Sequence, residues 1–405
     1  MTPMLPTVPA IGAVVYPPDR SPEALLAGFA AELKRRGFRL GGLVQETHHS
    51  AAGKEMVLVE LDSGHRLTLS QSLGPGSRAC SLDLEAMAEA SGAIRRAVAD
   101  RADLVLVNKF SKVETTGRGF AAEMLSAMVE GVPLLTAVPG AYVEEWIDFT
   151  GGRADLLMPT EADLWRWWGA HHLYDDLALG VADGPARRVV VGLNWTLVEG
   201  PDGVGMAQTP ERGTAGCRSM PGGGGLAGRS LRELAGLARS WDPFEVAVGI
   251  AACNAHYNRF DLPAADTNGL DAFPDPGRTV VVGAFPGIAE RLPGAQVLEK
   301  NPEPGQYPAD AAEWLLPGAE SVIMTASTLV NRSAPRLLGL ARKARVAVVG
   351  PGTPLSDRLF PYGVTVAAGL VATDPDGLAR TVAEGGGPRD IKRHCRQAAI
   401  RRAEG

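Results

Sequence analysis

The sequence predicts an α/β protein, and three observations lead to this fold class. Short apolar runs at residues 11–16 and 102–108 have the length and composition of buried strands. The stretch between them at 22–36 carries its apolar residues on one helical stripe. The same alternation of strand and helix starts again at residue 279. Alternation of this kind is typical of parallel sheets that are covered by helices on both faces.

The chain is too long for a single domain. Its 405 residues exceed the ~100–200 residues of an ordinary domain. We expect a P-loop-like parallel-sheet domain at 1–160 that lacks the phosphate-binding residues. A helix packed on it and a linker follow at 161–186, near a tryptophan cluster and the turn Asp183-Gly184-Pro185. A small α+β domain is expected at 187–270, and a second, Rossmann-like domain at 271–405.

The elements of the first domain follow from periodicity and turn residues. Strand 11–16 precedes helix 22–36, which Ser21 can cap and Gly37 ends. The remaining elements are expected as strands 38–45, 56–61 and 66–70, helix 84–100, strand 102–108, helix 119–130 and strand 132–137.

The later domains are assigned in the same way. A hairpin of 187–199 and 203–208 encloses a Gly-Pro-Asp-Gly turn, and helices are expected at 230–239 and from 243 onward. The last domain has strand-like runs that begin at residues 279, 295, 321, 346 and 364, with helices at 309–315, 334–344 and 376–384. The cationic run 389–402 is interpreted as a solvated C-terminal helix.

Charge and cysteine content exclude some classes of protein. A net charge of −6 argues against a nucleic-acid-binding protein, which needs a basic face. The four cysteines form no CxxC pair, so neither a disulfide framework nor a thiolate zinc site is indicated. No signal peptide and no apolar run of ~20 residues is found. We therefore expect a cytoplasmic protein without a membrane span, and homo-oligomerisation stays open.

Two groups in the first domain could bind a ligand. The loop after the first strand, 16–22, has neither glycine nor lysine, so a phosphate cradle and ordinary NTP hydrolysis are not expected. Asn108 and Lys109 follow a buried strand, where they form either a ligand site or a solvated loop. His48 and His49 could bind a metal or an oxyanion, although adjacent side chains of an extended segment diverge.

This domain resembles an uncharacterised bacterial family that is related to nucleoside triphosphatases and associated with molybdenum transport genes. The matching segments are 13–16, 41–45, 69–74 and 107–120. The resemblance implies a P-loop-like fold, but it implies no firm activity.

The last domain has a stronger site signal. Gly283, Phe285 and Pro286 follow its first strand, where a glycine and a Pro-Gly bend permit close ligand approach. Glu299 ends the second strand, where dinucleotide-binding sheets hold a ribose. Because GxGxxG is absent, NAD is a weak interpretation, and Glu299 could equally hold a metal or a ligand amine.

Hydroxyl and amide side chains gather after the third and fourth strands. Thr325, Ser327, Thr328 and Asn331 follow one strand, and Gly350 with Thr353 follows the next. Each hydroxyl alone could be a helix cap. Several polar strand ends together favour a pocket for a carboxylate or an oxyanion.

Residues 187–385 resemble the heavy-metal chelation family, a Rossmann-like domain preceded by one similar to the enolase N-terminal domain. The matching segments include 191–193, 249–255, 297–299, 325–331 and 349–354. The resemblance implies a crevice between the two domains that Asn254 and Glu299 face. His256 is a further metal candidate beside Cys253. Arg332 departs from the family pattern and either adds a cation to the pocket or is solvated.

Three functions are compatible with these features. The first is an accessory protein that binds a metal ion, a metal oxyanion such as molybdate, or a metal complex. The second is an enzyme acting on a small anionic organic ligand, with Glu299 as the acid–base group. The third is a regulatory nucleotide binder that uses the first domain, against which the missing lysine counts. The sequence leaves open which ligand is bound and whether any reaction is catalysed.

Overall fold

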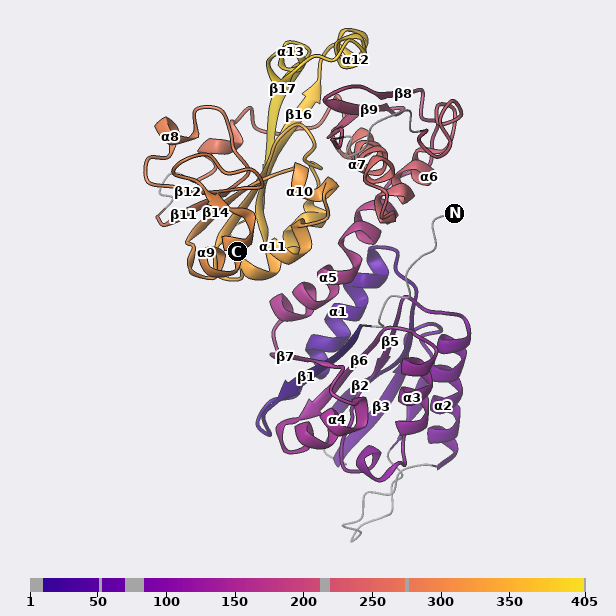
Figure 1. Ribbon diagram of the computed structural model, residues 1–405. Helices are drawn as coiled ribbons and strands as arrows, with labels where there is room; N and C mark the ends of the chain where they lie inside the picture. Colours follow the sequence, from indigo (N-terminus) through magenta and orange to yellow (C-terminus); the bar gives the residue numbers. More distant parts are fainter. Residues whose placement is uncertain (1–9, 51–52, 70–83, 212–218, 274–276, 404–405) are drawn as a thin grey trace. The chain divides into compact units, whose positions relative to one another are not determined.

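The computed structural model describes residues 10–50, 53–69, 84–211, 219–273 and 277–403 (Figure 1). The chain divides into two compact units, 1–167 and 168–405, which we call the first and second units. Cys80, Cys217 and residues 70–74 of the matching segment 69–74 lie outside the described residues.

The first unit contains a seven-stranded, mostly parallel sheet. Its strand order is β4-β3-β2-β5-β6-β1-β7, in which β3 pairs antiparallel with both β2 and β4 and all other neighbours pair in parallel. The predicted α/β class is therefore confirmed, while β7 was not predicted. The strands are β1 (Ile11–Tyr16), β2 (Leu40–Ser50), β3 (Gly53–Glu60), β4 (Arg66–Thr68), β5 (Leu104–Val107), β6 (Leu134–Pro139) and β7 (Asp155–Leu157).

Helices provide the core on both faces of this sheet. Trp146 and Phe110 pack at 5.0 Å in the cluster that α2 and α3 share with the sheet. On α1, Phe29 meets Trp165 at 5.1 Å. The helices are α1 (Glu23–Arg35), α2 (Leu84–Ala99), α3 (Ala121–Val129), α4 (Val143–Thr150) and α5 (Glu161–Leu179). The helix expected within 161–186 is the 19-residue helix α5.

The second unit begins with an antiparallel three-stranded sheet, β8 (Arg188–Val191), β9 (Trp195–Glu199) and β10 (Val204–Gln208). The predicted single strand 187–199 is wrong, because the Gly192 N–H closes a turn onto the Trp195 carbonyl at 2.9 Å. Helix α7 (Pro243–Tyr257) follows α6 (Leu231–Gly236) and packs directly on β10. A Cβ on Gly205 would lie 2.0 Å from the Ala251 carbonyl oxygen, so only glycine permits this approach.

A second seven-stranded sheet completes the second unit, in the order β13-β12-β11-β14-β15-β16-β17. Its first six strands are parallel and have the order of the doubly wound dinucleotide fold. The chain reverses its winding between β11 and β14, which is where such sheets open a crevice. The strands are β11 (Thr279–Val282), β12 (Gln296–Glu299), β13 (Tyr307–Pro308), β14 (Ser321–Thr325), β15 (Arg345–Val349), β16 (Val364–Ala372) and β17 (Cys395–Arg401).

Short helices connect these strands. They are α8 (Ile288–Arg291), α9 (Ala312–Leu315), α10 (Ser327–Val330), α11 (Ala334–Leu340), α12 (Pro375–Ala383) and α13 (Pro388–Lys392). The described helices include none that is both long and apolar enough to cross a membrane.

The expectation of a helix over 389–402 is wrong. Helix α13 ends at Lys392, and the chain returns as β17, antiparallel to β16. The reason is packing: Ala398 and Ala399 are buried, and Ala399 pairs with Ala368 of β16. The sheet thereby gains an edge strand from residues whose charges suggested a solvated helix.

Candidate ligand-binding groove

The second unit contains a cavity of about 1640 Å³, which we call the groove. Part of its lining comes from the loops at the carboxyl ends of β11, β12, β14 and β15. Doubly wound sheets bind their ligands at this edge. The lining segments are 191–195, 208–211, 243–244, 267–270, 282–286, 291, 298–301, 309, 325–337 in part, 349–351, 368–370 and 388–397 in part.

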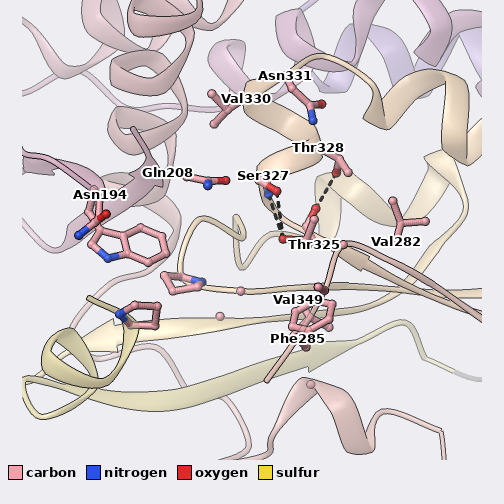
Figure 2. A pocket seen from close by; sticks show the side chains of 18 of the residues that line it. Asn194, Gln208, Val282, Phe285, Thr325, Ser327, Thr328, Val330, Asn331 and Val349 are labelled. Atoms are coloured by element: carbon pink, nitrogen blue, oxygen red, sulfur yellow. Dashed lines mark hydrogen bonds between the residues drawn. The ribbon is translucent and has the colours of Figure 1, made fainter. Parts of the chain in front are cut away.

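Hydroxyl groups after β14 form one polar end of the groove (Figure 2). Ser327 Oγ donates to Thr325 Oγ1 at 3.1 Å, and Thr328 Oγ1 donates to the Thr325 carbonyl at 2.7 Å. Thr328 is therefore committed to the backbone and is nearly inaccessible. Thr325 and Ser327 are only half-buried, and they keep hydrogen-bonding capacity for a ligand.

Asn331 lies on the same side of the groove. Its Oδ1 accepts from the Ser333 N–H at 3.0 Å and from the Ser333 hydroxyl at 2.6 Å. The acceptor atom is thus occupied, whereas the Asn331 amide can still donate. Together with the two hydroxyls it makes this end of the groove rich in donors.

Gly283 brings the β11 loop against this cluster. Its φ is +93°, and a Cβ there would lie 2.5 Å from Thr325 Cγ2. Gly350, in the loop after β15, also has a positive φ of +135°. Both positions need glycine for their backbone conformation, and Gly283 needs it for space as well.

Glu299 holds the first strand-end loop in place. Its Oε2 accepts from the Ala284 N–H at 2.6 Å, and its Oε1 accepts from the Lys300 N–H at 2.8 Å. In a dinucleotide site the amides of the first loop face phosphate. Here a carboxylate occupies one of them, so this loop is not arranged as a pyrophosphate cradle. Phe285 is half-buried against the sheet core, and Pro286 is exposed at the rim.

Asn254 and Thr353 do not line the groove, which corrects the expectation for both residues. Asn254 is fully buried, and its Nδ2 donates to the Met206 carbonyl at 2.8 Å and the Gly352 carbonyl at 2.9 Å. It thus ties α7 to β10 and to the loop after β15. Asn254 Oδ1 and Thr353 Oγ1 are buried and have no partner among the described residues.

His256 is half-buried on α7 and is also absent from the groove lining. Burial lowers the pKa of its imidazole, and the neighbouring Arg259 lowers it further. Cys253 is fully buried, and burial raises the pKa of its thiol to about 12, so it stays protonated at neutral pH. Within the described part of the chain, no three His, Cys, Asp or Glu side chains gather as a metal site would require.

Arg332 is neither a groove cation nor solvated. Its guanidinium stacks on the rings of Tyr174 at 4.3 Å and Trp241 at 4.5 Å. It donates to the Ala238 and Ser240 carbonyls at 2.9 Å each. Burial lowers its pKa. Its φ of +62° is the left-handed conformation, in which it locks the turn after α10 onto the segment before α7.

Cations outnumber carboxylates along the groove. The positive side chains of the lining are Arg291, Lys300, Arg336, Arg389 and Lys392, and its carboxylates are Glu211 and Glu299. Exposed ion pairs join Arg291 to Asp271 and Arg336 to Glu313. These five cations could not be placed in the site from the sequence, because their position at the groove depends on tertiary structure.

The candidates of the first unit are placed separately. Asn108 is buried at the end of β5, and its Nδ2 donates to Gln45 Oε1 at 3.1 Å, whereas Lys109 is exposed. His48 lies 3.3 Å from Glu46 on β2 and is exposed. For His49 the structure describes only the backbone, which belongs to β2.

Family models match three segments of the chain. Residues 11–167 match the family described as "Protein of unknown function (DUF2478)". Residues 174–257 and 270–401 match two models, DUF4213 and DUF364, both described as "Putative heavy-metal chelation". The two chelation models cover the antiparallel sheet with α7 and the doubly wound sheet, respectively.

Solved structures are similar to the second unit. A DUF364-family protein of unknown function from Desulfitobacterium hafniense is 31% identical, with a TM-score of 0.53, over 58% of this chain and 98% of its own. A protein of unknown function from the same family in Pyrococcus horikoshii is 22% identical, with a TM-score of 0.50, over 58% of this chain and 100% of its own. The second of these shows the fold alone.

The N-terminal region has a curated relative in Bradyrhizobium diazoefficiens, the "Molybdenum import ATP-binding protein ModC 2". The two are 40% identical over 160 residues, which is 39% of this chain. The match spans only 18% of the relative's length.

Proposed function

Because this chain belongs, through its second unit, to the DUF364 family, we propose that its groove binds a metal in anionic form. The ligand would be an oxyanion such as molybdate or an anionic metal complex. The protein would act in the cytoplasm as an accessory protein for metal homeostasis or metallocofactor supply. The description of the family supports the metal, and the lining of the groove supports the anionic form.

One observation carries the anionic form of the ligand: the groove offers donors and cations rather than metal ligands. A bare transition-metal ion is held by several His, Cys or carboxylate groups. Glu299 is a carboxylate of the groove whose two oxygens already accept backbone N–H groups. Thr325, Ser327 and the Asn331 amide instead suit the oxygens of an anion.

The molybdenum assignment draws on the first unit. A relative of that region is named for molybdenum import, and molybdate is the oxyanion form of this metal. The first unit itself lacks the glycine and lysine of a phosphate cradle between Tyr16 and Pro22. We therefore place the metal in the groove and assign the first unit no nucleotide hydrolysis.

Calorimetric titration of the full chain tests this proposal. Molybdate and tungstate should bind one per chain, and Zn²⁺ or Ni²⁺ should bind neither stoichiometrically nor in competition with them. Thr325→Val combined with Ser327→Ala should weaken binding about tenfold or more, since two charged hydrogen bonds are lost. Thr365→Val is the matched control, because Thr365 lies on β16 outside the groove and its hydroxyl bonds the Val346 carbonyl.

A second function is favoured by the size of the groove. Its volume of about 1640 Å³ exceeds the ~300–1,000 Å³ typical of small-molecule sites and far exceeds one oxyanion. An enzyme acting on a small anionic organic ligand would use this space, with Glu299 as the acid–base group. A crystal soak that places an organic molecule against Glu299, without metal, would favour this alternative.

A further inference from the structure

Two cations of the groove lining lie on α13, which follows the segment that the β8–β9 turn contacts, and both are left without partners among the described residues. Arg389 and Lys392 are exposed, line the groove and lie three residues apart on α13, hence on one helical face. Neither has an ion pair or a side-chain hydrogen bond within the described part of the chain. Asp390 lies between them in sequence, but its Oδ2 accepts from the Gly387 N–H at 3.0 Å and its Oδ1 lies 3.8 Å from Arg393. Arg389 and Lys392 are therefore two cations, one helical turn apart, that form no ion pair with a described residue.

Packing fixes this cationic pair at the groove. Ile391 is fully buried in a cluster with Leu378 and Val382 of α12, and Trp195 packs against the same cluster. The Asn194 amide donates to the Gly385 carbonyl at 2.8 Å, which joins the β8–β9 turn to the chain just before α13. The single turn of α13 is thus anchored, so the stems of both cationic side chains start from a fixed position beside the groove.

An apolar surface adjoins the cationic pair. Leu193 is 78% exposed, and Trp195 and Phe244 line the same groove. The Trp195 indole Nε1 is buried and has no acceptor among the described residues. Figure 2 shows Asn194 on one side of the drawn side chains, Thr325, Ser327 and Asn331 on the other, and Gln208 between them. The groove lining thus combines the donors after β14, an apolar stretch at the β8–β9 turn and the cations of α13.

We propose that Arg389 and Lys392 form a second anionic subsite, so that the groove takes an elongated organic molecule with an anionic group at each end. The inference rests on the proposed function in one respect: the metal would enter as a complex of this molecule. An aromatic or aliphatic middle section would cover Leu193 and Trp195. Volume supports an extended occupant, since an oxyanion at the hydroxyl end would leave the rest of the 1640 Å³ groove to water.

Two metal-free probes that share one biphenyl core test the subsite. Biphenyl-4,4′-dicarboxylate carries both anionic groups, and biphenyl-4-carboxylate carries one. Calorimetry on the full chain should find the dicarboxylate bound about tenfold more tightly, with an advantage that shrinks as salt is raised. The combined Arg389→Ala and Lys392→Ala substitutions should abolish this advantage, and Arg389→Glu with Lys392→Glu should reverse it.

Arg393→Ala is the matched control, because Arg393 follows the same helix, pairs with Asp390 and does not line the groove. It should leave the dicarboxylate advantage intact, and thermal melting should show all variants folded. Equal binding of both probes, no binding of either, or an unchanged advantage in the Arg389 and Lys392 variants would overturn the subsite.

Molybdate separates the two proposals. If molybdate binds and depends on Thr325 and Ser327 while the dicarboxylate shows no advantage, the subsite is refuted and the metal function stands. If the dicarboxylate depends on Arg389 and Lys392 but no metal species binds, the subsite stands and the metal function fails.

Discussion

The Glu299 carboxylate and the Ala284 backbone N–H, fifteen residues apart in sequence, are joined by a hydrogen bond of 2.6 Å. This bond closes the loop after β11 onto the end of β12. The position that takes a ribose in dinucleotide-binding sheets is here used to hold the loop that shapes the groove. Glu299 therefore acts first as a positioning residue.

Glu299→Gln should destabilise the second unit. An amide has one acceptor, so either the Ala284 N–H or the Lys300 N–H loses its partner and faces an NH₂ group. Because both hydrogen bonds are exposed and water can replace the lost partner, the expected loss is about 0.5–1.5 kcal/mol of unfolding free energy. Urea denaturation measures it. Unchanged stability together with a lost Zn²⁺ affinity would instead identify Glu299 as a metal ligand.

Gly283→Ala should cost more stability than Gly294→Ala. Both glycines have a positive φ, +93° and +87°, so alanine at either position must adopt the strained left-handed backbone conformation. A Cβ at Gly294 meets nothing within 4 Å, whereas one at Gly283 would lie 2.5 Å from Thr325 Cγ2. The difference between the two variants, expected at about 1–3 kcal/mol, isolates the steric contact.

Equal losses in the two glycine variants would show that the contact with Thr325 is unimportant. Molybdate affinity provides a second readout. It should fall in Gly283→Ala, because Thr325 must shift, and stay unchanged in Gly294→Ala.

Asn254→Ala should be among the most destabilising single substitutions in the second unit. It leaves the Met206 and Gly352 carbonyls buried without a donor, at about 1–3 kcal/mol each. Chemical denaturation of the variant measures the loss. Asn194→Ala is a suitable comparison, because Asn194 also donates to a carbonyl but is exposed. A loss in Asn254→Ala no larger than in Asn194→Ala would contradict the tie between α7 and the β15 loop.

The lowered pKa of His256 predicts that the free energy of unfolding depends on pH. Because burial and Arg259 lower its pKa in the folded state, the unfolded chain binds the proton at a higher pH. The stability tied to His256 is therefore complete above the unfolded pKa of about 6.5 and falls as the pH drops through that value.

Thermal melting of the wild type and of His256→Gln between pH 7.5 and 5.5 checks this dependence. The variant should lose less stability across that range, and it should bind molybdate normally because His256 does not line the groove. A steeper loss in the variant would contradict the sign, and a loss of metal binding would restore His256 as a ligand.

Much of the architecture follows from local patterns. The apolar strands could be predicted because a buried parallel strand leaves a continuous hydrophobic run in the sequence. The location of Thr325 and Ser327 at one edge of the sheet followed from the rule that parallel strands end together. The edge strand β17 could not be predicted in this way, because its charged residues hid the buried pair Ala398 and Ala399.

The roles of residues that contact distant segments could not be predicted from local sequence patterns. Asn254 lies on a helix that is buried nearly all round, so its sequence neighbours do not indicate which carbonyls it meets. From the sequence alone, Arg389 and Lys392 belong to a run that predicts a solvated helix. In the structure, Ile391 anchors α13 beside Trp195. Arg332 pairs with Tyr174 and Trp241, which lie on two separate segments.

Anomalous diffraction from crystals of the full chain soaked in tungstate tests the central claim most directly. Tungsten scatters strongly, and tungstate has the charge and shape of molybdate. The account predicts one principal peak in the groove, within hydrogen-bonding reach of Thr325 and Ser327, that disappears in the Thr325→Val and Ser327→Ala double variant. A groove without tungsten, or a peak elsewhere that survives the double substitution, would contradict it.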